Sequence, residues 1–211
     1  MTCIVALVEK GVIWMGGDSA ITSPDDTYEQ EILNNPKIFA RRDGKQNVWL
    51  IGSCGDFRGA QLLEHSVLLP DLTNGGMENV LGFIVTQFIP NLRSALRQGG
   101  ALKEQAGEND ETDMEILIGL KEQIFYIDST FQVLCPSNAH TAIGSGRGPA
   151  LGALGATEKL LGPEERILVA LEQSQEYTSS VREPFLVLNS ADAEANVKYV
   201  RARRRRPRKR T

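Results

Sequence analysis

The sequence predicts an α+β fold built mostly of antiparallel sheets. Its 211 residues fit one large domain. Runs of β-branched and apolar residues predict strands near the start, in the middle and near the end of the chain, and two pairs of amphipathic segments between them predict helices. Because strands and helices come in runs rather than in strict alternation, we expect two central sheets with a helix pair outside each, a four-layer α-β-β-α sandwich.

The first eighteen residues predict a buried β-hairpin. Residues 3–8 are all β-branched or apolar, Lys10-Gly11 supplies a turn, and residues 12–15 form the returning strand. Both faces of the first strand are apolar, which is typical of a strand buried between two layers. Chain ends are usually frayed, so a buried start indicates that the terminus itself is used.

The next part of the chain predicts a second hairpin and two helices. Residues 19–36 are rich in turn formers and read as a polar connection, and strands at 37–40 and 47–52 flank the turn Asp43-Gly44. Asp56 is a good N-cap for a helix that ends at Leu69, before Pro70. Helical spacing predicts a longer helix over 77–98, kinked at Pro90, and a polar loop over 101–113.

The second half predicts further strands, two helices and one glycine-rich segment. Strands are expected at 114–120, 123–127, 131–134, 141–143, 185–188 and 197–200, and helices from Pro149 to about 161 and over 164–177. The segment Gly144-Ser145-Gly146-Arg147-Gly148 lies between a strand and a helix, where a phosphate-binding loop would lie. It lacks the Gly-Lys-Ser/Thr ending and has no Rossmann unit around it, which disfavours phosphate binding.

Charge divides the chain into a domain, residues 1–200, and a basic tail, residues 201–211. The tail holds eight of the 23 basic residues and none of the 27 acidic ones, so residues 1–200 carry a net charge of −12. Such a block is expected to be disordered. It would bind nucleic acid nonspecifically through Arg201 to Arg210, and a solubilising or localising tail is an equal alternative.

Composition also excludes several classes of protein. No apolar run is long enough to span a membrane, and the first apolar run lacks the basic flank of a signal peptide. Three widely spaced cysteines, Cys3, Cys54 and Cys135, form neither a disulfide framework nor a zinc site. We therefore expect a cytoplasmic protein without a membrane partner, a metal or a cofactor.

Thr2 is a candidate nucleophile. If Met1 is removed, the Thr2 hydroxyl lies close to its own free α-amine. A hydroxyl needs a base to take its proton, and an α-amine with a pKa of about 8 can be that base. On these two residues alone, an ordinary chain start is the simpler interpretation.

Four segments in order resemble the signatures of one family, the proteasome β-type subunits, and are close to the bacterial peptidase HslV. This family belongs to the N-terminal-nucleophile (Ntn) hydrolase superfamily. The resemblance runs from Thr2 to about Ser180. The segments are Thr2-Cys3-Ile4-Val5 with Gly17-Asp18, Asn35-Pro36-Lys37-Ile38, Gly52-Ser53-Cys54-Gly55-Asp56, and Ala142-Ile143-Gly144-Ser145-Gly146 followed by Ala150-Leu151.

The resemblance implies an Ntn-hydrolase fold and a set of catalytic residues. Thr2 would be the nucleophile and, through its amine, the base. Lys37 would lower the pKa of the Thr2 amine and hydroxyl, and Asp18 would hold Lys37 in place. The Gly52 N–H would form the oxyanion hole, and Ser145 would hydrogen-bond the Thr2 amine.

One segment departs from the family pattern. The family has an Asp, a Ser three residues later and then a Gly near the end of the last helix. The matching stretch is Glu176-Tyr177-Thr178-Ser179-Ser180, so Ser179 takes the serine position, Glu176 replaces the Asp and the Gly is missing.

Two functions follow from the resemblance and its departure. The first is an N-terminal threonine peptidase or amidase that cleaves peptides or unfolded proteins inside a homo-oligomeric ring, with an ATP-dependent unfoldase as a candidate partner. The alternative is a catalytically weak or inactive proteasome-like assembly protein with a nucleic-acid-binding tail. Thr2, Asp18 and Lys37 favour the first, while Glu176 and the tail favour the second.

Overall fold

A computed structural model describes residues 2–22, 30–32, 35–73, 76, 78–103, 110–192 and 198–200. The predicted basic tail, residues 201–211, lies outside the described residues, as do residues 23–29 of the predicted polar connection. The division into a domain and a tail therefore stays a prediction.

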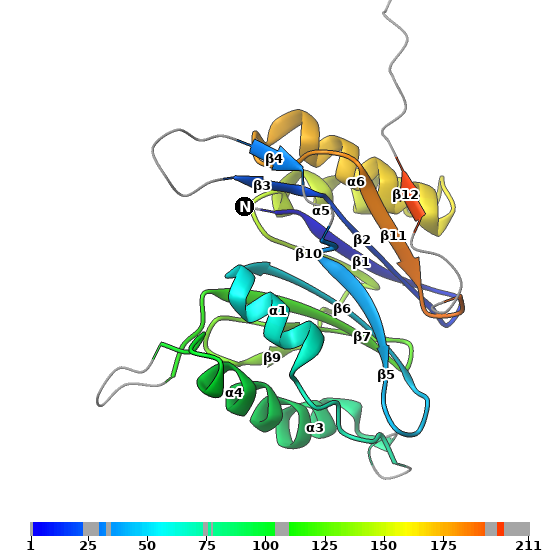
Figure 1. Ribbon diagram of the computed structural model, residues 1–211. Helices are drawn as coiled ribbons and strands as arrows, with labels where there is room; N and C mark the ends of the chain where they lie inside the picture. The colour runs from blue at the N-terminus through cyan, green and yellow to red at the C-terminus, as the bar shows by residue number, and fades with distance from the viewer. Residues whose placement is uncertain are drawn as a thin grey trace, which may run out of the picture.

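Two five-stranded antiparallel sheets form the centre of the molecule (Figure 1), which confirms the expected class of helices with antiparallel sheets. The first sheet has the order β10 (His140–Ile143), β1 (Ile4–Glu9), β2 (Val12–Gly17), β11 (Phe185–Asn189) and β12 (Lys198–Val200). The second has the order β5 (Ile38–Arg42), β6 (Val48–Gly55), β7 (Met114–Leu120), β8 (Gln123–Ile127) and β9 (Val133–Leu134).

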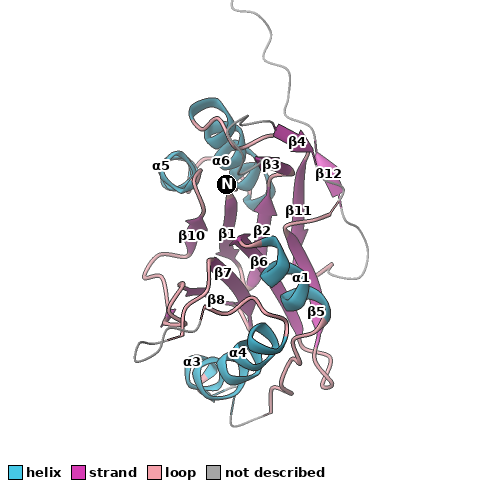
Figure 2. Ribbon diagram, turned by 60° about the vertical axis from the view of Figure 1, so that its left-hand side comes forward, coloured by secondary structure: helices cyan, strands magenta, loops and turns pink. Residues whose placement is uncertain are grey.

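The helices lie on the outer sides of the two sheets, as Figure 2 also shows. α5 (Arg147–Thr157) and α6 (Pro163–Tyr177) pack on the first sheet, with Leu154, Ile167 and Leu171 against Val5 and Leu7. α1 (Phe57–His65), α3 (Val80–Phe83), the π-helix η1 (Ile84–Phe88) and α4 (Ile89–Gln98) pack on the second sheet.

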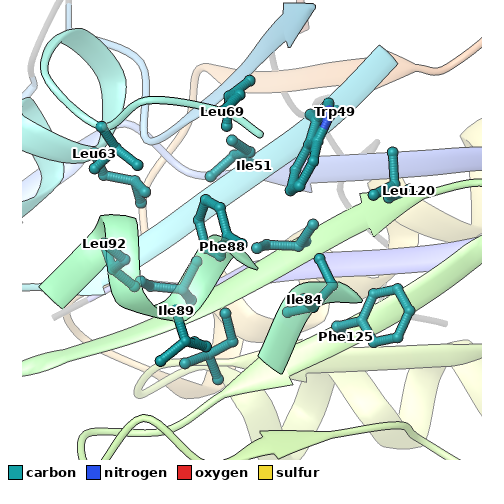
Figure 3. Packing of buried hydrophobic residues seen from close by; sticks show 14 of the residues in the cluster. Trp49, Ile51, Leu63, Leu69, Ile84, Phe88, Ile89, Leu92, Leu120 and Phe125 are labelled. Carbon is teal, nitrogen blue, oxygen red and sulfur yellow. The ribbon is translucent and has the colours of Figure 1, made fainter. Parts of the chain in front are cut away.

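Three buried clusters hold these layers together. Trp49 and Phe88 meet at a ring-centroid distance of 5.3 Å in the cluster between the second sheet and its helices (Figure 3). The facing sides of the two sheets enclose another cluster, which includes Ile4, Ile38 and Leu117. Strand β1 therefore contributes side chains to cores on both of its faces, as its uninterrupted apolar sequence predicts.

The predicted polar connection contains a short hairpin. β3 (Ala20–Thr22) pairs with β4 (Gln30–Ile32) in antiparallel register. Three-residue strands between turn formers give almost no periodic signal, so the sequence did not predict them. β3 begins two residues after Asp18 and lies beside the N-terminus of the chain (Figure 1).

Two predicted helices differ in detail. α1 ends at His65 rather than Leu69, because Arg41 Nη1 donates to the carbonyls of Leu63 and Val67 and holds the chain in a turn. The long helix is interrupted by η1, whose last bond runs from Ile89 N–H to the carbonyl of Ile84. Pro90 lies in the first turn of α4. Instead of the predicted kink at Pro90, the structure has a π-helical turn just before this proline.

Candidate active site

Thr2 lies two residues before β1, where two loops enclose it. Its side chain and backbone are 3 % exposed. The Gly146 N–H donates to the Thr2 carbonyl at 3.2 Å, and the Asp18 N–H donates to the Cys3 carbonyl at 3.2 Å. Gly144 closes the first of these loops with φ +85°, and a Cβ there would lie 2.3 Å from the Thr2 carbonyl oxygen, so only glycine fits.

Lys37 and Asp18 converge on the Thr2 hydroxyl. Lys37 Nζ donates to Thr2 Oγ1 at 3.0 Å and to Asp18 Oδ1 at 2.9 Å. Its remaining donor goes to the carbonyl of Ala20 at the start of β3. An ammonium has three N–H donors, and all three of those on Lys37 have an acceptor, which fixes the position of the group.

Backbone N–H groups hold the Asp18 carboxylate in turn. Oδ1 accepts from Cys3 N at 3.0 Å, and Oδ2 accepts from Ala20 N at 3.1 Å and from Arg182 N at 3.4 Å. These donors come from three separate segments, so Asp18 ties together β1, β3 and the chain after α6. The carboxylate is fully buried, and Lys37 and these donors compensate its charge.

Burial and charge act in opposite directions on Lys37. Burial lowers the pKa of the Lys37 ammonium below its usual value, and the Asp18 carboxylate raises it in part. The Lys37 side chain lies next to the Thr2 hydroxyl, where a positive charge would favour the ionised form of that hydroxyl.

The Thr2 nitrogen meets the loop after β10. Thr2 N donates to Ser145 Oγ at 3.2 Å, and Ser145 Oγ donates to the Thr2 carbonyl at 3.2 Å. With Met1 attached, this nitrogen is a peptide N–H, and it marks where the α-amine of Met1-free protein would be. The structure therefore brings Thr2, Asp18, Lys37 and Ser145 together.

The serine near the end of α6 is Ser180 rather than the expected Ser179. Ser180 is 1 % exposed, and its Oγ lies 2.9 Å from Ser145 Oγ, whereas Ser179 is exposed. α6 ends at Tyr177, and a turn with Val181 N donating to the Thr178 carbonyl points Ser180 inward. The sequence signal for this choice is the apolar Val181 directly after Ser180, which the structure buries completely.

The acidic position of the family pattern has no counterpart beside Ser180. Glu176 is exposed on the last turn of α6 and lies outside the group around Thr2. Counting three residues back from Ser180 gives Tyr177, which is 72 % exposed. Glu176 was chosen because it precedes Ser179 by three residues. Since Ser180 rather than Ser179 lies against Ser145, that spacing no longer selects Glu176.

Gly52 also differs from its expected role. Its backbone lies in β6 between Ile38 of β5 and Leu117 of β7. Ser53 N donates to the Lys37 carbonyl at 3.1 Å, and successive amides of a strand point in opposite directions, so the Gly52 N–H points toward β7. A Cβ at Gly52 would lie 2.9 Å from Ile38 and Ile4, so this glycine serves close packing of the sheets.

A carboxylate that the sequence did not single out supports the Ser145 loop. Glu115 of β7 accepts from Gly144 N at 3.1 Å and from Tyr126 Oη at 2.6 Å. Cys54 Sγ donates to the same carboxylate at 3.3 Å. Burial, together with nearby Glu115, raises the pKa values of both Cys54 and Tyr126, so both groups stay protonated donors. Glu115 has no motif of its own, and only the sheet register reveals it.

A cavity of about 230 Å³ opens beside Thr2 between β5, β6 and α1. Its wall includes Thr2, Lys37, Ser53 and Cys54, and it continues along α1 to Glu64. Gly52 is not part of this wall. The nucleophile candidate therefore borders a space large enough for a side chain of a substrate.

Within the described part of the chain, no group of three or more His, Cys, Asp or Glu side chains is arranged to hold a metal ion. The same residues include no helix long and apolar enough to cross a membrane.

Comparison with known proteins establishes the fold. No family model and no curated protein sequence matches the chain. Solved structures do: BPH of Thiobacillus denitrificans in complex with epoxomicin is 20 % identical with a TM-score of 0.68, covering 89 % of this chain and 97 % of that one. HslV of Trypanosoma brucei is 19 % identical with a TM-score of 0.61, covering 89 % and 98 %.

The chain is also similar to a structure of an Anbu protein. The helical assembly of the Anbu complex from Pseudomonas aeruginosa is 12 % identical with a TM-score of 0.63, covering 90 % of this chain and 80 % of that one. At these identities the likeness concerns the fold. The resemblance drawn from the four sequence segments is confirmed at that level: the chain folds like BPH, HslV and Anbu.

Proposed function

We propose that this chain is an N-terminal threonine peptidase or amidase of the proteasome-like Ntn hydrolases, with their four-layer α-β-β-α sandwich. One observation carries the proposal. The buried Thr2 hydroxyl lies 3.0 Å from the Lys37 ammonium, while the Thr2 nitrogen faces Ser145. Nucleophile, cation and prospective base meet at one threonine, and a cavity opens beside it.

The chemistry begins with removal of Met1, which frees the Thr2 amine. The amine takes the hydroxyl proton as Oγ1 attacks a peptide carbonyl carbon, and the carbonyl π electrons move to its oxygen. The C–N bond then breaks, and the leaving amine takes the proton held on the Thr2 nitrogen. Water attacks the resulting ester with the same amine as base, which releases the acid and restores Thr2.

Lys37, Asp18 and Ser145 prepare these steps. The Lys37 charge stabilises the developing alkoxide and keeps the nearby amine unprotonated. Asp18 fixes Lys37, and Ser145 orients the nitrogen, with Ser180 fixing Ser145 in turn. Gly52 enters this account only as a packing residue.

Hydrolysis of fluorogenic peptides tests the proposal. The protein is first shown to lack Met1 by intact-mass spectrometry. We expect Thr2→Ala to lower kcat/KM by about 10³-fold or more, as in other enzymes that lose a nucleophile. Thr73→Ala removes an exposed threonine hydroxyl and is the matched control, which should retain full activity. Equal hydrolysis by wild type and Thr2→Ala would contradict the proposal.

A second candidate is a weak or inactive assembly protein. The exposed Tyr177 at the family's acidic position favours it, because Ser180 then lacks the carboxylate of the family pattern. Under this alternative, Met1-free protein would assemble normally and leave every peptide intact.

We further propose that the chain forms a homo-oligomer in the cytoplasm, a ring that admits peptides or unfolded proteins and that an ATP-dependent unfoldase can serve. The helical assembly of Anbu from Pseudomonas aeruginosa supports self-association. So do the exposed apolar residues Leu81 and Val85 on neighbouring turns of α3 and η1. Sedimentation velocity should show an assembly well above the 23.2 kDa chain. A monomer at every salt concentration would contradict this.

The basic tail carries a separate proposal, binding of nucleic acid. The reason is its eight cationic residues beside an acidic domain. Deletion of residues 201–211 should abolish binding of DNA or RNA and leave peptide hydrolysis unchanged. Full-length protein that binds neither at low salt would refute it.

A further inference from the structure

Both apolar and polar side chains line the cavity beside Thr2. Phe39 of β5 and Phe57 and Ala60 of α1 form the apolar part. Ser53, Gln61 and Glu64 supply the polar part. The wall is well fixed, because the Asp56 side chain caps α1 by accepting from Arg58 N and Gly59 N.

The Ser53 hydroxyl is an unsatisfied group in this wall. Ser53 is 4 % exposed, and its Oγ makes no hydrogen bond within the described part of the chain. A buried hydroxyl without a partner is unfavourable, and such groups in native proteins call for an explanation. A ligand that carries a hydrogen-bond donor into the cavity would supply the missing partner.

The charge available in the wall is negative. Lys37 lines the cavity, but its three donors go to Thr2, Asp18 and the Ala20 carbonyl. Asp56 lines it too, but its carboxylate caps α1. That leaves Glu64, whose side chain is 30 % exposed.

The neighbours of Glu64 leave its carboxylate available. His65 Nε2 lies 3.5 Å from Oε2, on a side chain that is 70 % exposed. Arg41 lies near enough to interact electrostatically with the Glu64 carboxylate. Its Nη1, however, donates to the carbonyls of Leu63 and Val67, and Arg41 is not part of the cavity wall. A cation inside the cavity could therefore approach the Glu64 carboxylate, which lines the cavity.

We propose that this cavity selects a basic side chain, lysine or arginine, on the substrate residue next to the bond that Thr2 attacks. The aliphatic stem lies along Phe39, Phe57 and Ala60, as long cationic side chains do on apolar surfaces. The cationic head approaches Glu64, and one of its N–H groups donates to Ser53 Oγ. This inference rests on the proposed function, because it names the substrate class of the same site.

Matched substrates test the selection. Peptides that differ only at the residue before the reporter group carry lysine, arginine, norleucine or glutamate there. In wild type we expect kcat/KM for lysine to exceed that for norleucine by about tenfold, the effect of one charge-assisted contact in a partly exposed site. Glutamate should be the poorest. The preference should weaken as salt is added.

Variants assign the preference to named side chains. Glu64→Gln should bring lysine and norleucine to nearly equal kcat/KM, while Glu158→Gln, an exposed glutamate at the end of α5, should leave the tenfold ratio unchanged. Ser53→Ala should reduce the ratio through KM. A wild type that prefers norleucine, or a lysine preference that survives Glu64→Gln, would overturn the inference.

A binding measurement keeps this inference separate from the catalytic proposal. Thr2→Ala protein is titrated by calorimetry with peptide amides that end in lysine or in norleucine. Tighter binding of the lysine peptide, lost in Thr2→Ala/Glu64→Gln, supports the inference even if wild type hydrolyses nothing. Equal binding of the two peptides overturns it even if wild type is an active peptidase.

Discussion

Replacing Lys37 by methionine should destabilise the fold as well as the proposed catalysis. Methionine keeps most of the aliphatic length and removes the ammonium. The fully buried Asp18 carboxylate would then lose the cation at 2.9 Å. An unpaired buried charge is among the few causes of a large loss from one substitution.

The expected magnitude follows from what still holds Asp18. Breaking a buried pair by removing one partner costs about 3–5 kcal/mol. Three backbone N–H groups continue to donate to the Asp18 carboxylate, from Cys3, Ala20 and Arg182. We therefore expect the lower end, a loss of about 3 kcal/mol in the free energy of unfolding, because charge-assisted hydrogen bonds remain.

Urea unfolding, followed by tryptophan fluorescence at one fixed protein concentration, measures this loss. Lys45→Met, at an exposed lysine, is the matched control and should change the free energy of unfolding by less than about 0.5 kcal/mol. Asp18→Asn/Lys37→Met should regain part of the loss, since the Asn oxygen still accepts N–H groups and carries no charge. A Lys37→Met loss below about 1 kcal/mol, with no recovery in the double variant, would refute the buried-pair reasoning.

Three further predictions concern activity. Burial lowers the pKa of Lys37 and the Asp18 carboxylate raises it in part, so Asp18→Asn should lower this pKa further. The decrease of kcat/KM at alkaline pH should then begin at a lower pH in a pH–rate profile. A profile that keeps its wild-type alkaline limb would contradict this. Glu115→Gln should lower kcat about tenfold with KM nearly unchanged, because the Ser145 loop loses its charged acceptor; steady-state kinetics would contradict this by showing a change in KM alone. Ser180→Ala should lower kcat, and Ser179→Ala, the exposed neighbour, should not; equal effects would argue against the Ser180 contact.

Much of the fold could be predicted because its signals are local. The first hairpin follows from an apolar run and a Lys10-Gly11 turn, and both turn residues have positive φ. The Asp56 cap follows from one residue type at a helix start. The convergence of Thr2 and Lys37 was expected only through resemblance, since 35 residues separate them and their contact depends on how two sheets pack.

The remaining parts of the site depend on register that single residues do not reveal. Ser179 and Ser180 are adjacent serines, and only the turn after α6 decides which one is buried. Gly52 lies within a glycine segment typical of an oxyanion site. The N–H of the next residue, Ser53, donates to the Lys37 carbonyl, so the Gly52 N–H points the opposite way. Glu115 reaches the site because β7 pairs with β6 opposite Cys54.

Covalent labelling of Thr2 shows whether this residue is both the nucleophile and the base. An epoxyketone peptide closes a ring with a hydroxyl and a free amine on the same residue, so it reports both proposed roles of Thr2 at once. Met1-free protein is incubated with the peptide and examined by intact-mass and peptide-mapping spectrometry. We expect one adduct per chain, located at Thr2 and absent from Thr2→Ala. An unlabelled Met1-free assembly, or an adduct that persists in Thr2→Ala, would contradict it.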